Sequence, residues 1–364
     1  MVQHNVLITG GSGYLGGTLL NRLTEPSLTN TLPGLSKGNI YALVRNESQA
    51  EAVRSLYGVT PLTFDINDAN AVRDAIVSNK ITVVYFLVDP VRSDAQVHFI
   101  RALGEVRHSL TAQRDCVDAV HFLHTTGAKM FSSHTGAPTD RPLLDNDPGL
   151  FEIHRAQRGK HPVLNQAVQT NITVIEEGEK HGVRTYIFTP CIVYGKGEGF
   201  GNKISIQTVD IVKAAKAAGG VFKVNNGKPS WPVCHIEDNT SLYIDLLKGI
   251  LQGGESSPDH GRNGFYLAAS GNVAWDDLYE AMAKTLAKRG VIKYSTIVQA
   301  DQTTLEKMGA ALDGAPAEFV SVYVGGLCTF TAEHGKKLGW KPEFVPEHIL
   351  EAADEEVDWI LKHL

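Results

Sequence analysis

Residues 5–17, NVLITGGSGYLGG, decide the fold of this 364-residue chain. Residues 5–9 form a short run of apolar and β-branched side chains that predicts a buried strand, and residues 13–23 predict the helix that follows. Glycines in the turn between them let the backbone approach a pyrophosphate, which the free N–H groups of the helix can bind. Because the motif lies between a strand and a helix, it predicts a dinucleotide site at Gly10, Gly13, Tyr14, Leu15 and Gly16.

Short β-rich runs alternate with longer helical stretches along the rest of the chain, a pattern typical of a parallel sheet with crossover helices. We therefore predict an α/β fold, a Rossmann-type doubly wound parallel sheet with a smaller, mainly helical C-terminal substrate lobe. Six further strands are expected, at residues 39–44, 60–64, 82–88, 119–124, 184–188 and 265–268.

Two polar segments, residues 132–161 and 194–232, interrupt this alternation, and a mainly helical part begins at Trp275. Ligands of open α/β sheets bind outside the carboxyl ends of the strands, so we expect the substrate lobe to lie there. The dinucleotide-binding domain is then expected to comprise residues 1–190 with 233–270. The lobe is expected to comprise residues 191–232 with 271–364.

Composition limits the class of partner. A net charge of -6 argues against a nucleic acid or an anionic membrane, because either would favour a basic surface. No apolar run is long enough to span a bilayer, and the first residues lead directly into a strand, so a cytoplasmic location is expected. The four cysteines lack zinc-type spacing, so no metal site is expected.

The end of the second predicted strand indicates which dinucleotide binds. An acidic residue there would hold the ribose 2′-hydroxyl of NAD, whereas an arginine accommodates a 2′-phosphate. Arg45 occupies this position and predicts NADP(H); the alternative is a surface arginine, with Glu47 or another acid serving NAD. The remaining residues expected at the cofactor follow later strands; they are Asp65, Ile66, Thr125, Pro190 and Ile192.

The glycine motif, with TFDIND at 63–68, FTPCIVYGKG at 188–197 and TAEHGKKLGWKPEF at 331–344, resembles the extended short-chain dehydrogenase/reductase superfamily of the NAD-dependent epimerase/dehydratase type. That resemblance implies a serine or threonine after the fifth strand and a Tyr-x-x-x-Lys pair on the next helix. The equivalent positions here are Gly127, Val163 and Ala167. None of these side chains can transfer a proton at neutral pH, so the usual catalytic groups are absent from these positions.

Residues 126–129, TGAK, resemble the TGxK motif of the progesterone 5-beta-reductase/iridoid synthase group, which implies a lysine in the active site and enone reduction by NADPH. Independently, a lysine directly after the fifth strand lies at the lip of the cleft, where its charge can polarise a carbonyl oxygen. Lys129 is therefore the first catalytic candidate, with a solvent-facing loop lysine as the alternative. Thr126 and His134 are further catalytic candidates, and the substrate pocket is expected to include Phe200, Asn202 and Trp231.

Three functions stay open at this point. The first is an NADPH-dependent reductase of a carbonyl or activated C=C bond in a small metabolite. The second is a non-redox cyclase, isomerase or lyase that uses the cofactor as a scaffold. The third is a non-catalytic NADP(H)-binding regulator. Dimerisation through helices beside the sheet is common in the superfamily, and a homodimer is a further expectation, weakened by the many charges in residues 99–113.

Overall fold

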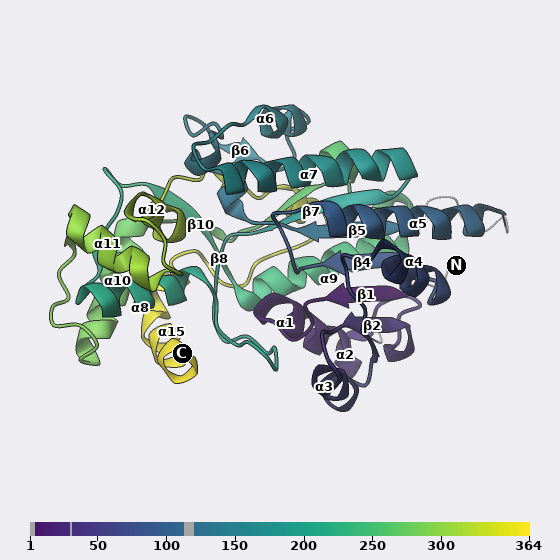
Figure 1. The fold of residues 1–364 in the computed structure, drawn as a ribbon, viewed down its shortest axis with the longest axis horizontal. Coiled ribbons are helices and arrows are strands. Elements are labelled where there is room, and N and C mark those ends of the chain that lie inside the picture. Colours follow the sequence, from purple (N-terminus) through teal and green to yellow (C-terminus); the bar gives the residue numbers. More distant parts are fainter. Residues whose placement is uncertain (1–3, 30, 113–119) are drawn as a thin grey trace.

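A computed structural model describes residues 4–29, 31–112 and 120–364. Its centre is a parallel sheet of seven strands in the order β11-β7-β5-β4-β1-β2-β3 (Figure 1). In chain order, the strands are β1 (Val6–Thr9), β2 (Ile40–Leu43), β3 (Thr60–Leu62), β4 (Val83–Phe86), β5 (His121–Thr125), β7 (Arg184–Pro190) and β11 (Phe265–Ala268). The predicted doubly wound sheet is confirmed, and its strand order reverses between β1 and β4, where ligands of such sheets bind.

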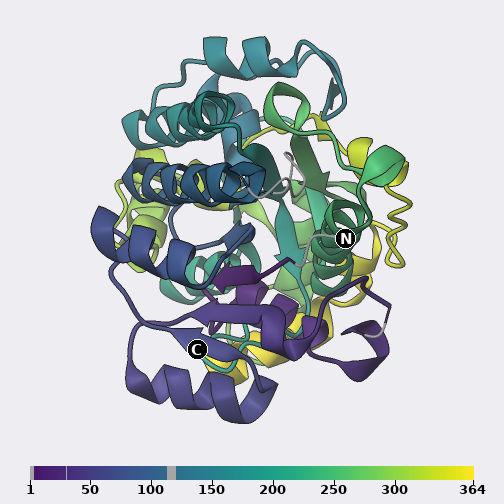
Figure 2. The ribbon, with the colours of Figure 1, turned by 90° about the vertical axis from the view of Figure 1, so that its right-hand side faces the viewer.

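Helices cover both faces of this sheet. α4, α5 and α7 pack side by side on one face, and α1 and α9 pack together on the other (Figures 1 and 2). Buried strands on both faces explain the continuous apolar runs of the sequence. The helices that belong to this part are α1 (Tyr14–Leu23), α2 (Pro26–Thr29), α3 (Glu47–Tyr57), α4 (Ala69–Ser78), α5 (Asp94–Ala112), α6 (Leu150–Ala156), α7 (Pro162–His181) and α9 (Ile236–Gln252).

The lobe lies at the end of the molecule toward which the strands run (Figure 1). It contains a three-stranded sheet of β12 (Gly271–Ala274), β10 (Ser230–His235) and β8 (Ile192–Tyr194), which the sequence did not reveal. Two short strand pairs join distant segments: β9 (Phe222–Lys223) with β13 (Val298–Gln299), and β6 (Leu143–Leu144) with β14 (Phe330–Thr331). The remaining helices are α8 (Gln207–Ala218), α10 (Trp275–Lys288), α11 (Gln302–Ala311), α12 (Val320–Val324), α13 (His334–Lys337), α14 (His348–Glu351) and α15 (Ala353–His363).

The predicted bounds of the seven strands agree with the structure to within a few residues. The strand expected at 119–124 is β5, and the charged helix expected at 99–113 is α5; residues 113 and 119 lie outside the described residues. In the part of the chain that the structure describes, no helix combines the length and apolarity needed to cross a membrane.

Candidate functional site

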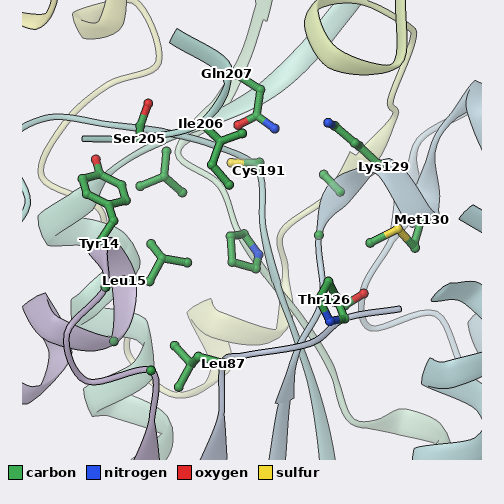
Figure 3. Close-up of a pocket in the computed structure, with 18 of the residues that line it drawn as sticks. Tyr14, Leu15, Leu87, Thr126, Lys129, Met130, Cys191, Ser205, Ile206 and Gln207 are labelled. Atoms are coloured by element: carbon green, nitrogen blue, oxygen red, sulfur yellow. The ribbon is translucent and has the colours of Figure 1, made fainter. Parts of the chain in front are cut away.

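A cavity of about 380 Å³ opens at the carboxyl ends of β1, β4, β5 and β7 (Figure 3). It therefore lies where the sheet topology places a ligand. Its walls bring together ten of the residues predicted from sequence: Gly10, Gly13, Tyr14, Leu15, Gly16, Thr126, Lys129, Pro190, Asn202 and Trp231.

The glycine turn has the geometry that a pyrophosphate requires. Gly10 adopts a φ of +68°, in the left-handed region that favours glycine. A Cβ on Gly16 would lie 2.5 Å from the Gly10 carbonyl oxygen, so the turn and the helix pack too closely for a side chain. No side chain caps Gly13, and the first-turn amides of α1, including those of Tyr14 and Leu15, have no intrahelical acceptors. These donors, at the positive end of the helix dipole, fit a dinucleotide pyrophosphate.

A loop of residues 195–205, here called the arm, closes over this turn. At its tip, the backbone amides of Gly201 and Asn202 donate hydrogen bonds to the carbonyl oxygen of Ser12, at 2.8 and 3.1 Å. A Cβ on Gly199 would overlap the carbonyl oxygen of Gly13. The arm thus packs directly on the cofactor turn, and Asn202 reaches the cavity from it.

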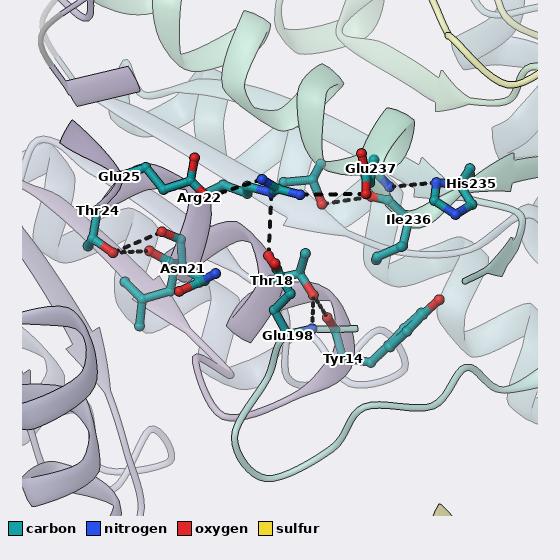
Figure 4. Close-up of polar contacts among 12 residues, drawn as sticks. Tyr14, Thr18, Asn21, Arg22, Thr24, Glu25, Glu198, His235, Ile236 and Glu237 are labelled. Atoms are coloured by element: carbon teal, nitrogen blue, oxygen red, sulfur yellow. Dashed lines mark hydrogen bonds and ion pairs between the residues drawn. The ribbon is translucent and has the colours of Figure 1, made fainter. Parts of the chain in front are cut away.

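Polar contacts along α1 fix the arm (Figure 4). The Tyr14 hydroxyl donates to the Gly195 carbonyl at 2.9 Å, and the Glu198 amide donates to the Thr18 hydroxyl at 3.0 Å. The Glu198 carboxylate also lies 3.4 Å from the Arg22 guanidinium. The side chain of Tyr14 is therefore occupied by the arm, which leaves its backbone amide for the cofactor.

Phe200 does not line the cavity. It lies at the tip of the arm, where its ring packs 6.2 Å from that of Tyr57 at the end of α3. The predicted substrate contact of Phe200 therefore lies outside these cavity walls, because its ring packs on Tyr57 instead.

The residues predicted for the adenosine end lie outside the cavity walls. Arg45 is exposed directly after β2, and its guanidinium has no hydrogen-bond or ion-pair partner among the described residues. Glu47, the acid considered for NAD, is instead bonded to Arg54 at 2.7 Å. Asp65 is exposed and accepts hydrogen bonds from the backbone and side chain of Asn67, and Ile66 beside it packs partly into the core.

Two strand-end residues point away from the cavity. The Thr125 hydroxyl is hydrogen-bonded to that of Tyr243 on α9, at 2.8 Å. Ile192 is fully buried in β8, whereas its neighbours Cys191 and Val193 line the cavity, because successive side chains of a strand face opposite sides. Only the backbone of Ile192 is left for a ligand.

Lys129 lines the cavity from the short helix η2 (Ala128–Phe131). Its ammonium nitrogen lies 5.3 Å from the centre of the Tyr323 ring and has no hydrogen-bond or ion-pair partner within the described part of the chain. Burial lowers the pKa of Lys129 from its usual value, and the negative charge of Asp210 opposes that shift. Asp210, on α8, is only 6% exposed, and desolvation raises its pKa to about 6 despite the opposing charge of Lys129.

The model of the NAD dependent epimerase/dehydratase family matches residues 6–255. The chain belongs to this family. Its fold is similar to that of dTDP-glucose 4,6-dehydratase from Bacillus anthracis in complex with NAD, with a TM-score of 0.61 and 12% identity over 99% of this chain and 97% of the other. It is also similar to a monomeric L-threonine 3-dehydrogenase from a metagenome and to UDP-glucose 4-epimerase from Thermotoga maritima. Both have a TM-score of 0.60 and 14% identity over 98% of this chain and 99% of theirs. A search of curated proteins found no match.

This member of the epimerase/dehydratase family differs at the helix expected to carry a tyrosine and a lysine. Val163 is 43% exposed at the start of α7, and Ala167 is buried. Helix η2 packs against α7 and lines the cavity through Ala128, Lys129 and Met130. The segment after β5 thus supplies the cationic group on this side of the cavity, and α7 contributes none of its walls.

The other two catalytic candidates differ in their placement. Thr126 lines the cavity, and its buried hydroxyl has no hydrogen-bond partner among the described residues. His134 does not line it: its Nε2 lies 3.1 Å from the Gly325 carbonyl oxygen, and its ring packs 6.0 Å from that of Trp231. The short helix η3 (Ser133–Thr135) turns His134 behind the cavity wall, so its prediction as a proton donor to the substrate is not supported.

Several residues that line the cavity were not predicted from the sequence. Leu87 and Pro90 follow β4, and the first residues of α8 enter from the lobe. The start of α8 carries no capping signal in the sequence, because its N-cap is Ile206 and no side chain caps it. Within residues 4–29, 31–112 and 120–364, no group of three or more His, Cys, Asp or Glu side chains could hold a metal ion. The lining residues that were missed are Leu87, Pro90, Met130, Val193, Ser205, Ile206 and Gln207.

Proposed function

We propose that this protein is an NADPH-dependent reductase of a carbonyl or an activated C=C bond in a small metabolite, with Lys129 as the group that polarises the substrate oxygen. The observation that carries the proposal is the Lys129 ammonium group, which lines the cavity and lacks a bonding partner among the described residues. A cation in a largely apolar cavity stabilises developing negative charge more strongly than the same cation does in water.

One part of the cavity wall would bind the cofactor, and another part would bind the substrate. The first turn of α1 would hold the pyrophosphate, and Pro190 and Cys191 would face the nicotinamide; when bound, the cofactor supplies the hydride. Substrate contacts come from Asn202, Trp231 and the start of α8. These assignments favour residues 1–190 with 233–270 as the NADP-binding domain and 191–232 with 271–364 as the substrate lobe, in an enzyme expected in the cytoplasm.

NADP(H) is favoured over NAD(H) at the end of β2. The guanidinium of Arg45 is available for a 2′-phosphate, while the carboxylate of Glu47 is engaged by Arg54 and so is not directed to a ribose 2′-hydroxyl. The dTDP-glucose 4,6-dehydratase that is described with NAD has the same fold but is only 12% identical to this chain, so its cofactor choice does not transfer.

The test is to mix the protein with NADPH and pools of enones, aldehydes and ketones and to follow the loss of reduced nicotinamide absorbance. Wild type should oxidise NADPH with one pool, and Lys129→Met should lose about 100-fold in kcat/KM, the usual effect of removing a donor to an oxyanion. Lys129→Arg, which keeps the charge, should retain part of the activity. The proposal would be overturned if the protein oxidises NADPH with none of the pools although NADPH raises its melting temperature, which shows that the cofactor binds.

A further inference from the structure

We propose that Gln207 is a second catalytic donor, which forms with Lys129 a two-donor clamp for the substrate oxygen; this rests on the proposed reductase function. Figure 3 shows the carboxamide of Gln207 directed into the cavity and toward the Lys129 ammonium group. Among the described residues, the structure gives that carboxamide no hydrogen-bond partner. A polar group that is partly withdrawn from water and left unbonded is available to a ligand.

The neighbours of Gln207 hold it in place. Gln207 is the first residue of α8, and the hydroxyl groups of Ser205 and Thr208 on either side are hydrogen-bonded to each other. Thr208 also donates to the buried Glu356 carboxylate at 2.7 Å. Since the start of α8 is anchored to α15 in this way, the Gln207 side chain is presented to the cavity from a fixed backbone.

Three other polar side chains in the same walls are already engaged, whereas the Thr126 hydroxyl, like the Gln207 carboxamide, has no partner among the described residues. The Tyr14 hydroxyl bonds to Gly195, and Asn202 Oδ1 accepts from the Ile204 amide at 3.1 Å. Ser205 is paired with Thr208. Gln207 complements Lys129 from the α8 side of the cavity, where its carboxamide is directed toward the ammonium group (Figure 3).

A second donor would add to the stabilisation of the substrate oxygen that Lys129 provides. As hydride reaches the carbon, the π electrons of the C=O or conjugated C=C move to the substrate oxygen, which becomes an alkoxide or an enolate. Lys129 and Gln207 would both bond to that oxygen, as preorganised donors do in oxyanion holes, and the amino end of α8 adds a favourable dipole. Lys129 then transfers a proton to the product oxygen and is reprotonated by water.

The inference is tested without turnover, using 4-nitrophenol as an oxyanion probe for the full-length protein with NADP+. Its absorbance separates phenol from phenolate, so the pKa of the bound probe reports how well the site holds an oxygen anion. Wild type should lower that pKa. Gln207→Met should bind phenolate about tenfold more weakly, with the affinity for neutral phenol unchanged, as expected for one hydrogen bond to a charged group.

Two further variants test whether the effect on phenolate binding is specific to the Gln207 carboxamide. Gln302→Met makes the same change at the first residue of another helix, α11, outside the cavity, and should match wild type. Gln207→Glu, which places a carboxylate at the same position, should weaken phenolate binding further, and it serves if Gln207→Met does not fold. Absence of phenolate binding by wild type, or an equal loss of phenol and phenolate in Gln207→Met, would overturn the clamp. If wild type binds phenolate through Gln207 as expected but oxidises no NADPH, only the proposed reductase function would be overturned.

Discussion

The carboxylate of Glu356 accepts a hydrogen bond from the backbone amide of Gly195 at 2.9 Å, across 161 residues of chain. Its other oxygen accepts from the Thr208 hydroxyl. Gly195 begins the arm and Thr208 lies in the first turn of α8. One buried side chain of the C-terminal helix therefore fixes both segments that carry Asn202 and Gln207 to the cavity.

Glu356→Ala is expected to destabilise the fold by about 2–6 kcal/mol, because two donors would each lose their acceptor at about 1–3 kcal/mol. Urea unfolding measures this loss. Glu355→Ala is the matched control: that side chain is 78% exposed and pairs with Lys196 at the surface, so a change within about 0.5 kcal/mol is expected. Equal losses in the two variants would show that Glu356 does not anchor the arm and α8.

Gly199→Ala is expected to lift the arm from α1, since the added Cβ would overlap the carbonyl oxygen of Gly13. The arm should then become sensitive to protease, and NADPH should bind more weakly because the cofactor turn loses its cover. Limited proteolysis and NADPH titration check both effects. Gly38→Ala adds a methyl that would lie 3.7 Å from its nearest neighbour, an ordinary contact, and should change neither. An arm as resistant in Gly199→Ala as in wild type would contradict this account.

The features predicted correctly depend on local sequence. The turn at Gly10 and the strands of the sheet follow from short-range patterns, and the presence of Lys129 in the cavity wall follows from its place shortly after β5. Asp210 and Tyr323 could not be found in this way, because they are about 80 and 190 residues from Lys129 and reach it only once the lobe has packed. The sequence also could not show that His134 lies outside the cavity walls: Ser132 accepts from the His134 amide at the start of η3, and the imidazole contacts the Gly325 carbonyl oxygen.

Asp210→Asn is expected to stabilise the protein increasingly as the pH rises. The pKa of Asp210 in the fold is about 6, raised from 3.8 mainly by desolvation, with Lys129 and Lys213 lowering it and Asp313 raising it. Stability from the protonated carboxyl is thus fully present below pH 3.8 and is lost as the pH rises through 6. The advantage of the neutral amide should grow by about 1 kcal/mol between pH 5 and pH 8. Urea unfolding at both pH values measures it, and an advantage that does not change with pH would contradict the raised pKa.

Arg45→Ala is expected to weaken NADPH binding by about 10–100-fold and to leave NADH binding unchanged. The reason is that only NADPH carries the ribose 2′-phosphate, to which the guanidinium is expected to bond. Quenching of protein fluorescence by each cofactor gives the two dissociation constants. The control is Arg73→Ala, an exposed arginine on α4 that pairs with Glu105 at 2.8 Å, and its two constants should equal those of wild type. If Arg45→Ala weakens both cofactors alike, the arginine supports the fold of this edge and does not select the phosphate. If it weakens neither, the 2′-phosphate is held by another group and the preference for NADP(H) has to be assigned anew.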